Sequence, residues 1–320
     1  MAKRYYYLLG IFILIIILLR IDFHKLLITF SGLNVFLFFL ISLLIIPVVF
    51  LKSLRWKYIL AFQPAHYSTK EAFLVYLSSI YLGLVTPGRV GEASRAFYLR
   101  RDKGLALGRG VATVFLDRLY DLTPLLLISL LGLQSFFNKA SSQFFLMAAL
   151  IILAVMSPFV LLKRSVIGYL AKYFLSINFI KKHKIRIKFH YEEFRDAIKK
   201  MGGAGAIVSF GITIAGYLVY FTQCYLLMLF LGIEMPFIKV VFFVSITSLV
   251  SLIPVTVAGL GTREATLVYL FSTSGRSAEE AVAFSFLFFV SFYLITGVLG
   301  FIGWVIKGGS EELFVKSYGT

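Results

Sequence analysis

Charged residues are scarce in this sequence of 320 amino acids: they make up 15% of it, against 60% hydrophobic residues. Soluble domains of this length carry about 25% charged residues. Apolar runs near or above the length that crosses a bilayer recur throughout, at about 5–20, 33–51, 72–86, 110–134, 143–162, 204–231, 237–257 and 281–306. This pattern excludes a soluble domain with one anchor. It predicts a single all-α domain over residues 1–320, a polytopic membrane helix bundle.

Cysteine is also nearly absent, since Cys224 is the only one and lies inside an apolar run. A single cysteine excludes an intrachain disulfide framework and a cysteine metal site. The four histidines are scattered without metal-ligand spacing, and no phosphate-loop, dinucleotide, nucleophile-elbow or zinc motif occurs. We therefore expect no cofactor, no metal and no recognised catalytic machinery.

Acidic residues are few, with 15 Asp and Glu against 32 Lys and Arg, which gives a net charge of +17. Such an excess can indicate nucleic-acid binding, but no basic-aromatic groove or binding motif accompanies it. In an apolar chain the simpler explanation is that Lys and Arg collect in cytoplasmic loops. Lys3 and Arg4 precede the first apolar run, and no small-residue cleavage site follows it. The sequence therefore predicts a retained first span, cytoplasmic termini and a cell-membrane location.

Two apolar segments end in irregular sequence where a plain helix would continue, at residues 78–95 and 248–265. In each, a proline is followed by spaced glycines and then by an Arg and a Glu. Proline breaks a helix and glycine permits the turn that follows, but such backbone survives at membrane depth only where it is covered. We predict re-entrant or broken-helix hairpins near 72–99 and 237–273, with these hinge residues: Pro87, Gly88, Gly91, Pro254, Gly259 and Gly261.

The basic residues favour the re-entrant alternative. If both stretches return to the side from which they came, about six full spans remain, and 26 Lys and Arg fall inside against 6 outside. Full crossing by the first stretch would put the basic segment 163–200 outside, against the positive-inside rule. The two hairpins then enter from opposite faces, as in an inverted repeat with a binding site near the midplane.

The cytoplasmic segment 163–200 interleaves basic and aromatic residues. It fits one or two amphipathic helices on the inner leaflet, and a solvated basic loop is the alternative over 178–190. In the last span, Gly297, Gly300 and Gly303 recur every third residue, which predicts close helix packing.

Several ionisable residues are trapped by the hydrophobic pattern, where an unpaired charge costs several kcal/mol. Asp117 and Asp121 share one helix face, and Arg118 can pair with Asp121. One hypothesis is that these charges line a cavity for an anionic headgroup, because arginine suits phosphate. The other is that they only pair with one another and fix the hairpins. The candidates are Arg89, Glu92, Asp117, Arg118, Asp121, Arg263 and Glu264.

Other basic residues fit membrane anchors better. Arg55 and Trp56 follow the second apolar run, where an interfacial anchor is the ordinary interpretation. Arg95 is likewise predicted to be a plain cytoplasmic anchor rather than part of the site.

Three motifs occur in order: Pro-Gly-Arg-Val-Gly-Glu at 87–92, Asp-Arg-Leu-Tyr-Asp at 117–121 and Ala-Gly-Leu-Gly-Thr-Arg-Glu at 258–264. Together with Arg55-Trp56 they resemble the lysylphosphatidylglycerol synthase transmembrane-region family, also called flippase-like or UPF0104 proteins. The resemblance covers nearly the whole chain, although Ala258 stands where members often have glycine. It implies a helical membrane domain that moves lipids between leaflets, linked in some members to polyprenyl-linked glycans. The soluble aminoacyltransferase that some members carry has no counterpart here, so we expect no aminoacyl transfer.

The first functional hypothesis is a flippase for a phospholipid or a polyprenyl-phosphate-linked headgroup. Arg89, Arg118 and Arg263 would contact phosphate, while the four acids orient these arginines or relay protons. Its partners would be membrane lipids with anionic headgroups. The alternatives are a membrane transferase that uses Asp117 and Asp121, and a non-transporting scaffold for a lipid-modifying enzyme.

Overall fold

The computed structural model describes residues 14–17, 19, 21–136, 184–252 and 259–308. Within these ranges the regular structure is helical and contains no strand, so the predicted all-α class is confirmed. Three of the described helical stretches are long and apolar enough to cross a membrane: Val35–Leu60, Gly205–Phe230 and Ala278–Ile306. Many large apolar side chains on these stretches are exposed, as expected for surface that faces lipid. The predicted span 143–162 lies outside the described residues.

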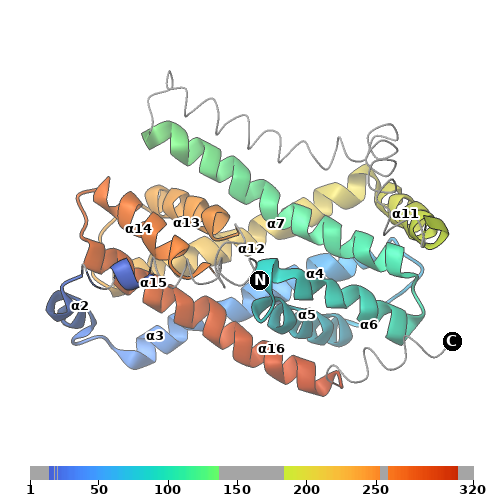
Figure 1. Ribbon diagram of the computed structural model, residues 1–320, viewed down its shortest axis with the longest axis horizontal. Coiled ribbons are helices and arrows are strands. Elements are labelled where there is room, and N and C mark those ends of the chain that lie inside the picture. The colour runs from blue at the N-terminus through green and yellow to red at the C-terminus, as the bar shows by residue number, and fades with distance from the viewer. Residues whose placement is uncertain (1–13, 18, 20, 137–183, 253–258, 309–320) are drawn as a thin grey trace.

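The helices are as follows, in chain order: α2 (Phe23–Phe30), α3 (Val35–Ser42), α4 (Ile45–Leu60), α5 (Thr69–Leu84), η2 (Pro87–Ala93), α6 (Ser94–Lys103), α7 (Leu107–Phe136), α11 (Lys184–Lys199), α12 (Gly202–Phe230), α13 (Phe237–Ser251), α14 (Thr262–Ser272), α15 (Ala278–Phe289), η4 (Val290–Leu294) and α16 (Ile295–Ile306). Figure 1 shows α13 and α14 toward one end of the long axis and α5 and α6 toward the other. The long helix formed by α15, η4 and α16 runs between the two ends.

Helix α4 continues well past the end of its apolar run. Pro47 is tolerated because it lies in the first turn, where a missing N–H costs little. The helix then carries Lys52, Arg55 and Trp56 on to Leu60 inside the bundle. The prediction that Arg55 and Trp56 anchor the protein at the interface is wrong, because their side chains are only 1% and 0% exposed.

The first hairpin consists of α5, η2 and α6. Ser68 and Glu71 form a capping box that starts α5, and Gly104 ends α6 in the left-handed conformation. The hydroxyl of Tyr67, just before α5, donates to Asp102 near the end of α6 at 2.9 Å. The chain therefore returns to the end from which it came. At 1.5 Å per residue, α5 is about 24 Å long and α6 about 15 Å, both shorter than the ~30 Å hydrocarbon core.

The second hairpin consists of α13 and α14, with residues 253–258, including Pro254, outside the described part of the chain. The guanidinium of Arg276, just after α14, donates to the carbonyl of Glu234, just before α13. The open end of this hairpin is therefore closed in the same manner. With lengths of about 22 and 16 Å, its helices are also shorter than the hydrocarbon core.

The two hairpins open at opposite ends of the molecule. The stretch Ala278–Ile306 has 29 residues, hence a length of about 44 Å. Arg276 pairs with Glu280 at its start, beside the second hairpin, while Lys307 at its end pairs with Asp102 of the first hairpin at 2.8 Å. The tip of each hairpin is the end opposite its open end: η2 in the first hairpin and residues 259–261 in the second. The two tips therefore face each other, in agreement with the predicted inverted arrangement. The entry of each hairpin into a bilayer stays a prediction.

This arrangement predicts which residues an external reagent reaches. Ser272 at the end of α14 and Arg100 on α6 are both exposed, at the open ends of the second and first hairpins. In a Cys224→Ala background, we expect Ser272→Cys to react with a membrane-impermeant maleimide in intact cells. Arg100→Cys should react only after the membrane is permeabilised. Labelling of the two cysteines on the same side would contradict the opposed topology.

Part of the basic segment 163–200 is a packed helix. Helix α11 contacts α7, where Phe194 meets Phe115 at 5.6 Å between ring centroids. The amide of Gln63 also donates to the carbonyl of Ala197 at 3.0 Å. The helical alternative is thus confirmed for residues 184–199, whereas residues 163–183 lie outside the described ranges.

The predicted glycine packing of the last span is also present. A Cβ built on Gly300 would lie 2.9 Å from the Leu77 carbonyl oxygen, and one on Gly303 would lie 2.9 Å from the Leu77 Cβ. These contacts hold α16 directly against α5, which brings the long helix beside the first hairpin.

Candidate functional site

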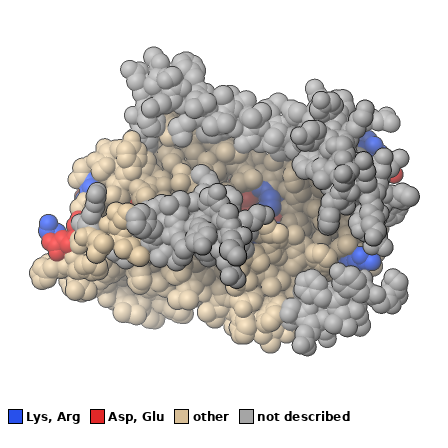
Figure 2. All heavy atoms as spheres, in the orientation of Figure 1, with Lys and Arg blue, Asp and Glu red and all other residues tan. Residues whose placement is uncertain are grey.

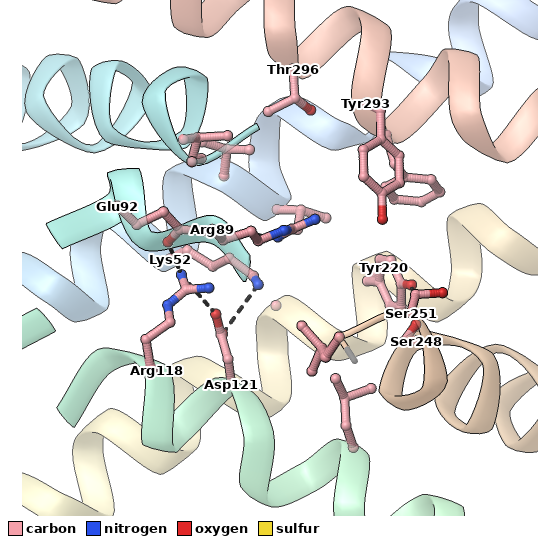
Figure 3. A pocket seen from close by; sticks show the side chains of 18 of the residues that line it. Lys52, Arg89, Glu92, Arg118, Asp121, Tyr220, Ser248, Ser251, Tyr293 and Thr296 are labelled. Atoms are coloured by element: carbon pink, nitrogen blue, oxygen red, sulfur yellow. Dashed lines mark hydrogen bonds and ion pairs between the residues drawn. The ribbon is translucent and has the colours of Figure 1, made fainter. Parts of the chain in front are cut away.

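A cavity of about 590 Å³ lies where the two hairpin tips meet the long helix. Its walls come from α4, α5, η2, α7, α12, α13, α14 and the α15–η4 region. In the space-filling view, most of the surface between the ends is uncharged, and a few acidic and basic atoms lie in a hollow near the middle (Figure 2). Figure 3 shows the charged side chains of α4, η2 and α7 on one side, facing Tyr220, Tyr293 and two serines on the other.

Behind the cavity wall, Asp117 is the centre of a buried ionic core. Its carboxylate accepts from Arg55 Nη2 at 2.6 Å and from Arg95 Nη1 at 2.6 Å. The hydroxyl of Tyr76 donates to the same carboxylate at 3.3 Å. Asp117 is completely buried and does not line the cavity, although it was predicted as a substrate contact. Its place among arginines from α4 and α6 fits the alternative hypothesis, that such charges hold helices together.

Arg95 belongs to this core, so its prediction as a cytoplasmic anchor is wrong. Its guanidinium is fully buried and lies over the rings of Tyr76 and Trp56, at 4.6 and 5.4 Å from their centroids. The rings cover the guanidinium, and Asp117 and Glu92 balance its charge. Arg95 is the second residue of α6, and its side chain is directed inward rather than toward water.

The side chains that face the cavity form a second ionic group. Arg118 Nη2 lies 2.7 Å from Glu92 and 3.1 Å from Asp121, which confirms the predicted pairing of Arg118 with Asp121. Lys52 Nζ lies 3.1 Å from Asp121. The Arg118 and Lys52 side chains are 30% and 28% exposed, so solvent or a ligand can reach them. Unlike the Asp117 core, this group is open on one side (Figure 3).

Arg89 is the most loosely paired of these cations. Its nearest carboxylate oxygen, on Glu92, is 3.9 Å away, and its side chain is 40% exposed. Its backbone φ of 56° is uncommon for a residue other than glycine. Strained backbone of this kind concentrates at functional sites.

The second hairpin contributes Arg263 and Glu264 to the site. Arg263 Nη2 donates to Glu264 Oε1 at 2.6 Å, and Ser285 donates to the same oxygen at 2.7 Å. The other oxygen of Glu264 accepts the Gly261 N–H at 2.6 Å and so caps α14. Arg263 lines the cavity, whereas Glu264 lies behind it. Arg263 is therefore part of the site, and Glu264 holds the Arg263 side chain in position from behind the cavity wall.

Glycines shape both hinges. A Cβ on Gly91 would lie 2.1 Å from the Leu82 carbonyl oxygen, so only glycine lets η2 approach α5 this closely. Gly259 and Gly261 have φ values of 76° and 85°, which favour glycine. Pro87 starts η2, and Gly88 lies in its first turn. The predicted hinge residues within the described chain thus lie at the two tips.

Replacing Gly91 with alanine should disturb the site through the backbone. The added Cβ would push η2 away from α5, together with Arg89 and Glu92, at a cost of about 1–3 kcal/mol. We expect a melting temperature in detergent that is lower by several degrees. Gly211→Ala is the matched control, because its Cβ would meet no atom within 4 Å. Equal melting temperatures for both variants would show that η2 tolerates the displacement.

The charges around the cavity do not cancel. Lys52, Arg55, Arg89, Arg118 and Arg263 line the cavity with Glu92 and Asp121, and Arg95, Asp117 and Glu264 lie behind it. Taken together, these six basic side chains and four carboxylates leave two positive charges in excess. Several buried polar atoms of cavity-lining residues also have no hydrogen-bond partner: the donors Arg118 Nε and Arg263 Nη1, the hydroxyls of Thr247 and Thr296, and the acceptor Asp121 Oδ2. Buried donors are ordinarily satisfied, so these indicate room for a ligand or water.

Sequence reasoning missed Lys52 as a cavity residue and Arg55 as a core residue. The hydropathy pattern ends near residue 51, so the sequence predicts an interfacial anchor for Arg55 and gives Lys52 no role in the site. Their spacing gave a usable signal, since Lys52 and Arg55 are three apart and share one face of a continuing helix. Among the described residues, no group of three His, Cys, Asp or Glu side chains could hold a metal ion.

Comparison with known proteins agrees with this architecture. The family profile described as the lysylphosphatidylglycerol synthase TM region matches residues 7–300. The chain belongs to this family. A UPF0104 membrane protein of Methanothermobacter thermautotrophicus is 24% identical over 283 residues, which cover 82% of this chain and 80% of the relative.

Another member, a UPF0104 membrane protein of Methanocaldococcus jannaschii, is 25% identical over 300 residues, or 88% of this chain and 87% of that protein. No solved structure matches the chain. Membership in the lysylphosphatidylglycerol synthase TM family supports a membrane location and a connection with lipids.

Proposed function

We propose that this protein binds the phosphate of an anionic membrane lipid between its hairpin tips and moves the headgroup between leaflets. One observation carries the proposal: the cavity lining and the ionic groups behind it hold an excess of two positive charges, and several buried polar atoms of the lining have no partner. Uncompensated charge at membrane depth is costly, so it indicates a function that uses it. A phosphate group would supply both the missing charge and the missing acceptors.

Three cations are placed to contact the phosphate. Arg118 and Lys52 point into the cavity from α7 and α4, and Arg89 reaches over it from η2 (Figure 3). The planar guanidinium of Arg118 belongs to a side chain that is 30% exposed, and its Nε has no hydrogen-bond partner. Glu92 and Asp121 hold Arg118 in place and keep enough negative charge nearby to limit the affinity. A transporter needs such balance, because its ligand must also leave.

The rest of the lining suits the apolar part of a lipid near the headgroup. Leu, Ile, Val and Phe side chains from α4, α7, α13 and α15 form a large apolar part of the cavity wall. The opposed hairpins place this site between the two ends of the molecule. This arrangement supports movement of a headgroup through the protein while the tails stay in the bilayer.

Reconstitution into liposomes tests the proposal. Headgroup-labelled phosphatidylglycerol is placed in both leaflets, an external quencher reports its exchange, and lipid extracts are analysed by mass spectrometry. We expect faster exchange than in protein-free liposomes, with unchanged lipid. A new lipid product would support the transferase instead. Neither exchange nor a product, with the folded protein present, would support the scaffold.

A further inference from the structure

Tyr293 lies between the two hairpin tips. The guanidinium of Arg89, from the first tip, is 5.6 Å from the centroid of its ring. The guanidinium of Arg263, from the second hairpin, is 5.4 Å from the same centroid. Figure 3 shows Arg89 extending across the cavity toward Tyr293. One aromatic ring therefore joins two elements that are 174 residues apart in the chain (89 to 263).

The long helix holds this ring in a fixed position. Tyr293 belongs to η4, a π-helical turn between α15 and α16, and such turns occur frequently at functional sites. Its ring stacks on Phe289 at 5.6 Å with an interplanar angle of 15°. The local sequence, an aromatic residue within an apolar helix, contains no charge that would reveal this role.

The two arginines differ in how firmly they are held. Arg263 is buried, pairs with Glu264 at 2.6 Å and lies over Phe288 and Phe289 as well as Tyr293. Within the described ranges, the ionic partner of Arg89 is Glu92 at 3.9 Å, and Glu92 is itself held by Arg118 at 2.7 Å. Arg89 is therefore the less firmly held of the two arginines that contact Tyr293.

We propose that Arg89 and Tyr293 form a latch, closed when the cavity holds no anion and opened when a lipid phosphate draws Arg89 off the ring. The latch rests on the proposed function for the identity of its ligand. A charge-assisted hydrogen bond from arginine to phosphate is stronger than a partly exposed cation–π contact. Arg89 therefore leaves the Tyr293 ring and binds the phosphate. When Arg89 leaves the ring, the contact that joins the two tips is lost. Binding of a lipid phosphate in the cavity thereby allows the tips to separate.

Distances between spin labels on the two hairpins test the latch. Val85 at the end of α5 and Ala265 on α14 are both exposed and do not line the cavity, so each accepts a labelled cysteine in a Cys224→Ala background. In phosphatidylcholine nanodiscs we expect one short distance population. Phosphatidylglycerol in the nanodisc should add a longer population. Tyr293→Leu should show the longer population without phosphatidylglycerol, with about a tenfold shift in the population ratio.

Tyr293→Phe keeps the ring but removes the hydroxyl, which also interacts with Arg89, so it should give a smaller longer-distance population than Tyr293→Leu does. The Arg89 side chain is 40% exposed, so Arg89→Gln should fold as the parent does and should resemble Tyr293→Leu, which covers the case in which the leucine variant does not fold. Short distances in both Tyr293→Leu and Arg89→Gln would overturn the latch, as would a parent distribution that phosphatidylglycerol leaves unchanged. Lipid exchange is measured separately, so a lipid-sensitive latch without exchange would reject transport and keep the latch.

Discussion

Asp117→Asn is expected to destabilise the protein more than any other single change in the ionic core. Asp117 accepts from Arg55 and Arg95 at 2.6 Å each, and all three side chains are buried. Asparagine keeps the shape but not the charge, and it leaves two buried guanidiniums undercompensated. Breaking a buried ion pair costs about 3–5 kcal/mol. The residual contacts of Arg55 with Asp121 and of Arg95 with Glu92 place the expected loss near the lower figure.

Thermal unfolding in detergent measures this loss. A destabilisation of about 3 kcal/mol corresponds to a melting temperature lower by about 5–10 °C. Asp196→Asn is the matched control, because Asp196 is exposed and its ion pair among the described residues is with its neighbour Arg195, at 3.3 Å. Its melting temperature should stay close to that of the parent. If the melting temperature of Asp117→Asn equals that of the parent, the ionic core around Asp117 does not hold α4, α6 and α7 together.

Arg118→Gln is expected to have the opposite profile, with a large loss of lipid exchange and little loss of stability. Removal of Arg118 leaves Glu92 with Arg95, and Asp121 with Arg55 and Lys52, so no carboxylate loses all its partners. The lost charge-assisted bond to phosphate is worth about 1.5–3 kcal/mol. The exchange rate should therefore fall by about 10- to 100-fold.

The liposome exchange assay, with a melting curve for each preparation, measures both quantities. Arg100→Gln is the control, since Arg100 is an exposed basic residue on α6 outside the cavity. It should exchange lipid at the parent rate. Loss of one hydrogen bond should slow exchange by more than about twofold. If the folded Arg118→Gln protein exchanges lipid within about twofold of the parent rate, Arg118 does not belong to the site.

The sequence predicts the local features of this fold well. Hydropathy locates the described spans, the proline and glycine pattern locates both hinges, and i,i+3 spacing predicts the pairing of Arg118 with Asp121. Each of these features depends on neighbours within a few residues. The basic residue count also predicts opposite hairpin directions, which the ends of the Ala278–Ile306 stretch reproduce.

The division of the charges into a buried core and an open site could not be predicted in this way. Asp117 pairs with Arg55, which is 62 residues away, and no local periodicity encodes that contact. Arg95 resembles an anchor because it follows a tip and precedes more basic residues, yet it turns inward. Tyr293 carries no distinguishing sequence signal, since its role comes from a π-helical turn and from two arginines of distant segments.

The central claim is that the cavity between the hairpin tips binds the phosphate of an anionic lipid. The most direct test is a cryo-electron microscopy structure in nanodiscs that contain phosphatidylglycerol. The account predicts phosphate density within hydrogen-bonding distance of Arg118 and Lys52, with the acyl chains leaving toward the bilayer. An empty or water-filled cavity, with ordered lipid only on the outer apolar surface, would contradict it.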